Sequence, residues 1–105
     1  MKFIVSSLSP AMVKLNDFAW VFHEVTEDEF QALTFDAYSC VGHQDIADAL
    51  SVAYNKEPVH ARPNDILLYA NLERGVLKFY CIQVLQTWSI LQREIEKGEI
   101  DYGAK

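Results

Sequence analysis

The sequence has few of the residues that mark several common protein classes. It contains four glycines and two cysteines among 105 residues. Neither the GxGxxG dinucleotide fingerprint nor a P-loop motif occurs in the sequence, so these phosphate-binding motifs are excluded. Two cysteines are too few for a disulfide scaffold. Because Cys40 and Cys81 stand in apolar surroundings, we expect both to be free thiols.

Long apolar runs are also absent. The opening residues MKFIV are followed at once by the polar SSLSP. A membrane span needs about 20 apolar residues, and a signal peptide needs an apolar stretch of about 7–15. We therefore expect no membrane partner and an intracellular, cytoplasmic location.

Positive charge is scarce and scattered. Nine Lys and Arg residues stand against fifteen Asp and Glu, which gives a formal net charge of −6. Binding to long nucleic acid needs clustered cations that neutralise phosphates, so this function is not expected. Binding of a small anionic ligand is still compatible with this charge, because a few hydrogen-bond donors inside a pocket can outweigh the repulsion from distant negative charges.

The residues that are present suffice for one folded core. Half of them are apolar and 12% are aromatic, so the chain is not expected to be disordered. A chain of this length can bury one core but not two. We therefore treat residues 1–105 as a single domain.

Hydrophobic spacing predicts alternating strands and helices in the first half of the chain. The alternation in 17–25 predicts a strand, and Thr26 followed by Glu29 is a capping-box pattern that predicts a helix to about residue 33. The other elements expected here are strands over 2–5 and 37–41, one helical turn within 11–15, and a helix from Gln44 to about Tyr54.

The second half predicts a hairpin. Two strand patterns, 66–72 and 76–86, are joined by the short glycine-containing sequence ERG. An edge strand around 59–62 and a closing helix over 89–100 are also expected. Together the elements predict an α/β or α+β domain with a mixed sheet of about five strands flanked by helices.

Gly42 and His43 stand at a predicted junction between a strand and a helix, in SCVGHQDIADALS. The first amides of a helix, including that of Gln44, are free to bind an anion. A histidine titrates near neutral pH and can give a proton to a leaving oxygen. The pattern indicates a phosphate site with an acid beside it. The alternative is that His43 caps the helix or is hydrogen-bonded in the core.

The other candidate residues give weaker signals. Arg62 suits a phosphate contact or a surface ion pair. The loop SSLSP, 6–10, follows the first strand, where ligands bind in α/β sheets, but it also reads as an ordinary turn. Cys40 and His43 have a zinc-like spacing without a second close pair of ligands, so no metal site is predicted. The remaining histidines, expected at the surface or half buried, are His23 and His60.

Four segments of the sequence, taken together, resemble a known protein family. In chain order they are FIVSSLSPAMV, CVGHQDIADALS, VHAR and KFYCIQVL. Together they resemble the viral ring nuclease family, the small proteins by which viruses disable type III CRISPR immunity. The resemblance spans most of the chain, and the Gly-His segment is its most specific part.

The resemblance implies a homodimer, or a higher homo-oligomer, that encloses a cyclic oligoadenylate, typically cyclic tetra-adenylate. The histidine of the family's Gly-His motif is the general acid, and His43 matches it. A ribose 2′-hydroxyl attacks its own phosphodiester and the histidine protonates the departing 5′-oxygen, with no metal or cofactor. The residues expected around the ligand, from the resemblance and from the helix start, are Ser6, Ser9, Gly42, Gln44, Arg62 and Gln83.

The sequence departs from the family after the last strand. There the family usually has an Arg-Leu-Pro-Glu-Gly-like run, whose arginine and glutamate complete the active site. Here Thr87 and Ile90 fall at those two positions, and Ala11 replaces a family asparagine in the first loop. Loss of one such contact lowers the rate on the order of 10²-fold or more. Glu73 and Arg74 would substitute only if their loop folded back.

Three functions therefore stay open. The first is a counter-defence enzyme that slowly linearises a cyclic oligoadenylate, in the host cytoplasm if the protein is viral. The second is a sponge that binds a cyclic nucleotide, or a cyclic ADP-ribose-like molecule, and leaves it intact. The third is an interaction module whose acidic surface suits a basic protein partner.

Overall fold

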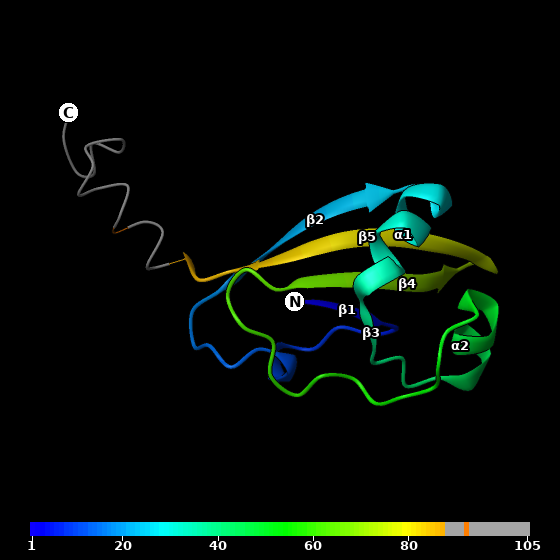
Figure 1. The fold of residues 1–105 in the computed structure, drawn as a ribbon. Coiled ribbons are helices and arrows are strands. Elements are labelled where there is room, and N and C mark those ends of the chain that lie inside the picture. The colour runs from blue at the N-terminus through cyan, green and yellow to red at the C-terminus, as the bar shows by residue number, and fades with distance from the viewer. Residues whose placement is uncertain (88–91, 93–105) are drawn as a thin grey trace.

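The strands form one mixed sheet in the order β2-β5-β4-β1-β3 (Figure 1). The computed structural model describes residues 1–87 and 92. The predicted fold, a five-stranded mixed sheet with helices in an α+β domain, is confirmed. Its elements are β1 (Lys2–Val5), η1 (Pro10–Met12), β2 (Ala19–Val25), α1 (Glu27–Leu33), η2 (Thr34–Asp36), β3 (Tyr38–Ser39), α2 (Gln44–Leu50), β4 (Ile66–Glu73) and β5 (Val76–Leu85).

Strand direction divides the sheet into two halves. β1 runs parallel to β3 on one side and to β4 on the other, whereas β5 runs antiparallel to β4 and β2. The β4–β5 hairpin turns at Arg74 and Gly75, whose φ angles are 52° and 80°. Two positive φ angles in succession are typical of the type I′ turn that suits the twist of a hairpin.

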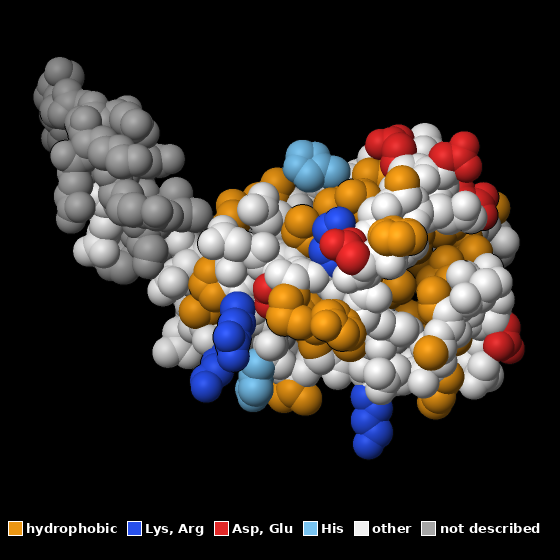
Figure 2. Space-filling model, viewed as in Figure 1, with side chains coloured by type: hydrophobic (Ala, Val, Ile, Leu, Met, Phe, Trp, Pro, Cys, Tyr) orange, Lys and Arg blue, Asp and Glu red, His pale blue; other side chains and the backbone are white. Residues whose placement is uncertain are grey.

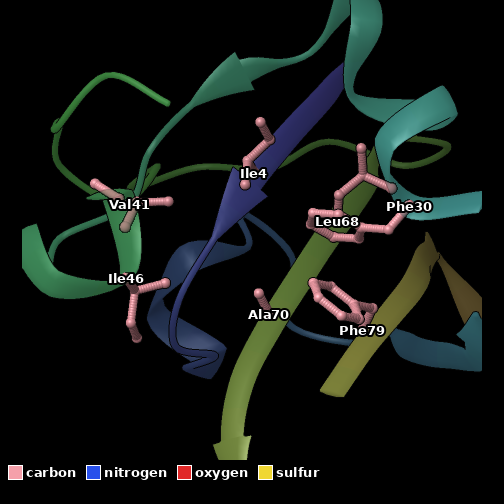
Figure 3. Close-up of a cluster of buried hydrophobic side chains, with 8 residues drawn as sticks. Ile4, Phe30, Val41, Ile46, Leu68, Ala70 and Phe79 are labelled. Carbon is pink, nitrogen blue, oxygen red and sulfur yellow. The ribbon is translucent and has the colours of Figure 1, made fainter. Parts of the chain in front are cut away.

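Both α-helices pack on the same face of the sheet. The predicted capping box starts α1: the Thr26 hydroxyl accepts from the Glu29 amide, and the Glu29 carboxylate accepts from the Thr26 amide. The rings of Phe30 and Phe79 join α1 to β5 with centroids 4.9 Å apart. The buried cluster under the helices consists of Ile4, Phe30, Val41, Ile46, Ala47, Leu68, Ala70 and Phe79 (Figure 3).

Irregular segments and η1 cover the opposite face. The cluster there consists of Val5, Met12, Val13, Cys40, Ala61, Leu67, Ile82 and Val84. Val13 and Ala61 form an isolated bridge, so the predicted edge strand at 59–62 is wrong. Pro58 and Pro63 bracket this segment, and because proline lacks an amide donor it interrupts a ladder of hydrogen bonds.

Several elements are shorter than the sequence predicts. β3 has two residues rather than the predicted 37–41, and β2 begins at Ala19 rather than at residue 17. The helix predicted to reach Tyr54 ends at Leu50, because Ser51 adopts a left-handed conformation with φ of 55° that no α-helix can continue. The helix predicted over 89–100 lies outside the described residues. Among residues 1–87, no helix is long and apolar enough to cross a membrane.

Leu68 provides a test of this core. It lies in β4, between β1 and β5, with none of its surface exposed. We expect Leu68→Ala to lower the free energy of unfolding by about 2–5 kcal/mol, because it removes buried carbon atoms and leaves a cavity. Leu72→Ala, on the same strand but at a 48% exposed position, is the matched control and should cost about 1 kcal/mol or less. Urea denaturation measures both, and equal losses would contradict this description of the core.

Candidate ligand-binding site at the ends of β1 and β3

β1 and β3 end side by side because they are paired in parallel. Their register places Ile4 opposite Ser39, and the Cys40 amide then donates to the Ile4 carbonyl at 2.8 Å. The residues that follow both strands therefore emerge at the same edge of the sheet. In sheets with parallel strands, ligands bind at this carboxyl edge.

A hydrogen bond joins the two loops that follow these strands. The Gly42 amide donates to the hydroxyl of Ser6 at 3.4 Å, and Ser6 is only 6% exposed. A Cβ atom added to Gly42 would meet Glu57 Cγ at 4.0 Å, which is ordinary van der Waals contact. Packing therefore does not require a glycine here. The Ser6 contact holds the loop together with the hydrogen bond from the Asn55 amide to the Val41 carbonyl at 2.9 Å.

His43 is exposed at the start of α2. It occupies the N-cap position with φ of −119° and ψ of 123°, but its side chain makes no capping hydrogen bond. Its carbonyl accepts from the Ala47 amide at 3.0 Å, so the backbone is held in place. The imidazole is therefore neither a cap nor part of the core, the two structural roles that the sequence left open.

Two other predicted site residues have local hydrogen bonds. The Gln44 side-chain amide donates to Asp48 Oδ1 at 2.8 Å, which directs it along the helix. The Ser9 hydroxyl accepts from the Ala11 amide at 3.3 Å and caps η1. Each of these two side chains has a structural partner, and contact with a ligand stays a prediction.

Arg62 and Gln83 lie at the opposite end of the sheet from His43. Gln83 and Lys2 both pair with Ile66, so Gln83 is level with the start of β1. Ser6 lies four residues after Lys2, which corresponds to about 13 Å along an extended strand. Arg62 is exposed at the turn before β4, where its amide donates to the carboxylate of Asp65 at 2.7 Å. One copy of the chain thus divides the predicted ligand residues between two places.

The position that matches the family's arginine has a different partner. The Thr87 hydroxyl donates to Asp17 Oδ1 at 2.6 Å. This side chain is neutral, and its nearest polar partner is a carboxylate. Ile90, at the position of the family's glutamate, lies outside the described residues.

Glu73 and Arg74 stay in the hairpin rather than folding back. Glu73 Oε1 accepts from the Tyr80 hydroxyl at 3.1 Å and from the side-chain amide of Asn71 at 3.4 Å. Arg74 is part of the tight turn itself. This arrangement therefore does not support the idea that Glu73 and Arg74 take the place of the family's arginine and glutamate.

Glu57 is the site residue that sequence reasoning missed. It is half-buried beside Gly42 and accepts a hydrogen bond from the Ser7 hydroxyl. Burial raises the pKa of the Cys40 thiol, and the negative charge of Glu57 raises it further. Burial likewise raises the pKa of Tyr69, with smaller contributions from Glu73 and Glu57. No local motif marks Glu57, because its partner Ser7 is fifty positions away.

Both cysteines are free, as predicted: Cys40 is buried and Cys81 is half-buried. Within residues 1–87, the structure brings together no group of three or more His, Cys, Asp or Glu side chains that could hold a metal ion. The zinc-like spacing of Cys40 and His43 therefore has no further ligands in this part of the chain.

The contact between Ser6 and Gly42 can be tested by hydrogen exchange. Ser6→Ala removes the acceptor and leaves the Gly42 amide without its partner, so we expect this amide to exchange faster with solvent. The Cys40 amide, which is bonded to the backbone of Ile4, is the internal control and should keep its rate. NMR exchange measurements follow both amides. An unchanged rate at Gly42 would show that Ser6 does not hold the loop.

Comparison with known proteins shows a shared fold. No protein-family model matches the chain, and no curated protein matches its sequence. Among solved structures, the chain is similar to B116 of Sulfolobus turreted icosahedral virus, with a TM-score of 0.66 and 15% sequence identity. The match covers 78% of this chain and 97% of that chain. At this identity the likeness concerns the fold alone: the chain has a fold that also occurs in a viral protein.

Proposed function

We propose that the chain is a viral counter-defence protein that binds a cyclic oligonucleotide immune signal of the cyclic oligoadenylate type. In this proposal two copies enclose the signal and His43 cleaves it slowly as the general acid. The observation that carries the proposal is the position of His43. Its imidazole is exposed, and the hydrogen bond between Gly42 and Ser6 joins its loop to the loop after β1.

The sequence resemblance and the fold support the proposal together. Two of the segments that resemble viral ring nucleases, the first loop and the Gly-His segment, are distant in the sequence. They meet at the ends of β1 and β3 through Ser6 and Gly42. The fold is shared with a viral protein over most of both chains.

A second copy accounts for the distribution of the other predicted residues. Arg62 and Gln83 lie at the far end of β1 from His43, so a small mononucleotide would not contact all of them in one chain. A ring of several nucleotides is more extended, and a two-fold partner presents each group of residues twice. The proposal therefore requires a dimer around a cyclic ligand.

The chemistry needs one proton donor at the leaving group. The ribose 2′-hydroxyl gives its proton to water while its oxygen attacks the neighbouring phosphorus. The bond from phosphorus to the 5′-oxygen breaks, and protonated His43 gives a proton to that oxygen. The products are a 2′,3′-cyclic phosphate and a free 5′-hydroxyl. Glu57 beside Gly42 brings negative charge to the proposed phosphate, and Thr87, which lies with Gln83 at the other end of the sheet, replaces an arginine of the family with a neutral side chain. The expected rate is therefore low.

Replacement of His43 tests the proposed cleavage. We expect the wild-type protein to convert cyclic tetra-adenylate into linear products, and His43→Ala to lose at least about 10²-fold in rate, the usual contribution of a general acid. His23→Ala is the matched control: His23 is also an exposed histidine, but it lies on β2, so this variant should keep the full rate. Chromatography of the nucleotide after incubation measures the products. Equal cleavage by His43→Ala and wild type would exclude His43 as the acid.

A sponge is the second candidate, and the contact between Thr87 and Asp17 favours it. Where the family has an arginine, a neutral hydroxyl is bound to a carboxylate, so that arginine's transition-state contact is missing. Binding in the ground state depends less on this contact than cleavage does. A protein with this site would hold the ring without opening it.

Heat release distinguishes the sponge from the enzyme. The protein is incubated with cyclic tetra-adenylate and related cyclic nucleotides, and the free nucleotide is measured before and after heat denaturation. A sponge lowers the free nucleotide and returns it intact on heating, and His43→Ala should still capture it, because no proton transfer is involved. Linear products identify the enzyme. No change in any sample contradicts both and favours the protein-interaction module.

A further inference from the structure

β2 forms an open edge of the sheet. It pairs with β5 on one side, and in the part of the chain that the structure describes no strand pairs with its other side. Figure 1 shows β2 along the outer margin of the sheet. About half of the backbone amides and carbonyls of an edge strand point away from the sheet, so they can bond to a further strand.

The opposite edge of the sheet is closed. β3 has only two residues, and the chain after α2 lies against it. The Ser39 hydroxyl donates to the Ala53 carbonyl, and the Asn55 amide donates to the Val41 carbonyl at 2.9 Å. Short strands and covering segments are two of the devices by which proteins protect a sheet edge.

β2 differs from β3 in length and regularity. It has seven residues, none of them proline, and it pairs one-to-one with β5 from Ala19 to Val25. This register leaves no room for a bulge, which would bend the strand and end its pairing. The edge at β2 is therefore long and regular enough to accept another strand.

One row of β2 side chains combines aromatic rings with a carboxylate. Trp20, Phe22 and Glu24 alternate along the strand, and Trp20 packs on the buried cluster of the η1 face. The Phe22 ring contacts Trp20 and Tyr80, with centroids 6.3 and 6.5 Å apart, yet it is 50% exposed. A strand added to β2 would place its own side chains directly beside Phe22 and Glu24.

The end of β2 is acidic. The side chain of Glu24 is 61% exposed, and its only ion-pair partner in the described chain is Lys78, at 3.7 Å. β2 leads into the first turn of α1, where three further carboxylates stand: Glu27, Asp28 and Glu29. Figure 2 shows acidic side chains gathered over the start of α1. Negative charge here repels phosphates and favours a cationic partner.

We propose that the edge of β2 binds an extended segment of another protein that carries arginine at alternate positions. The backbone of this segment continues the hydrogen-bonded ladder of the sheet, which is how peptides add to exposed edges. Its arginines on the η1 side lie against the ring of Phe22 and reach the carboxylate of Glu24. The main chain supplies affinity, and the arginines supply selectivity.

A second copy of the chain is a poorer partner for this edge. Two β2 strands related by a two-fold axis run antiparallel, so the acidic end of one strand would approach the start of the other. Asp17 stands just before β2, and each copy has a net charge of −6. Like charges therefore oppose pairing between two copies, whereas the same charges attract a cationic segment.

This surface is separate from the site at His43. β2 and β3 are the two outer strands of the sheet, and His43 follows β3. Neighbouring strands lie about 4.8 Å apart, so the two edges of this sheet are separated by about 19 Å. Binding at β2 therefore goes beyond the proposed function and needs no cyclic nucleotide.

Hydrogen exchange of the full chain tests the proposal. The probe is a capped seven-residue peptide in which arginine alternates with valine, and the control peptide has glutamate in place of arginine. We expect about every second amide of β2 to exchange fast in the free protein. These amides should slow about tenfold when the arginine peptide is present at ten times its Kd, because only the unbound protein then exchanges. The glutamate peptide should give no protection.

Substitutions on β2 test the side-chain contacts. Phe22→Ser removes the ring and Glu24→Lys reverses the charge, and each should weaken binding of the arginine peptide about 2–5-fold. Phe35→Ser is the matched control, because Phe35 is 95% exposed but stands on η2. Fluorescence anisotropy of labelled peptide measures the three Kd values. Thermal melting checks folding, and if Phe22→Ser does not fold, the exposed Glu24→Lys decides.

Three results would overturn the proposal. Slow exchange of every β2 amide in the free protein would show that the edge is already paired, by a second copy or by another part of the chain. Equal protection by the two peptides would remove the role of charge, and unchanged Kd values for both β2 variants would place the peptide elsewhere. No nucleotide is present, so failure here leaves the proposed function standing. Conversely, a protein that binds the arginine peptide but ignores cyclic tetra-adenylate retains this inference and loses the proposed function.

Discussion

The parallel pairing of β1 with β3 determines where His43 stands. β3 has only two residues, yet its register with β1 continues through the bond from the Cys40 amide to Ile4. The chain then reaches Gly42, whose amide binds the buried Ser6 hydroxyl. This pairing and the Gly42 contact bring the first loop next to the start of α2. The position of the exposed imidazole depends on hydrogen bonds of the backbone before it, to Ile4 at 2.8 Å and to the Ser6 hydroxyl at 3.4 Å, rather than on packing of its own side chain.

Two features, one at each end of the sheet, explain why the proposed chemistry should be slow. Glu57 lies beside Gly42 and brings negative charge to the place where a phosphate is proposed to bind. Thr87 is bonded to Asp17 at the position where the family has an arginine. In the proposed reaction, both features lower the positive charge around the transition state. Binding an extended ring through several weaker contacts is less sensitive to these losses than cleavage at a single phosphodiester.

Local signals in the sequence predicted the local structure. The capping box at Thr26 and the hairpin before Val76 depend on neighbouring residues, and both are confirmed. The end of α2 was predicted too late, because a left-handed Ser51 leaves no mark in hydrophobic spacing. The position of Glu57 depends on a partner fifty residues away, and the separation of Arg62 from His43 depends on strand order. Neither can be obtained from spacing along the chain.

The central claim is that the loops after β1 and β3 hold His43 in a site for a cyclic oligonucleotide. NMR titration of isotope-labelled protein with cyclic tetra-adenylate tests it most directly. The account predicts that the Gly42 amide and the His43 imidazole shift together, in proportion to bound ligand, while exposed His23 on β2 stays unchanged. Shifts confined to other residues, or no saturable shift at Gly42 and His43, would contradict the account.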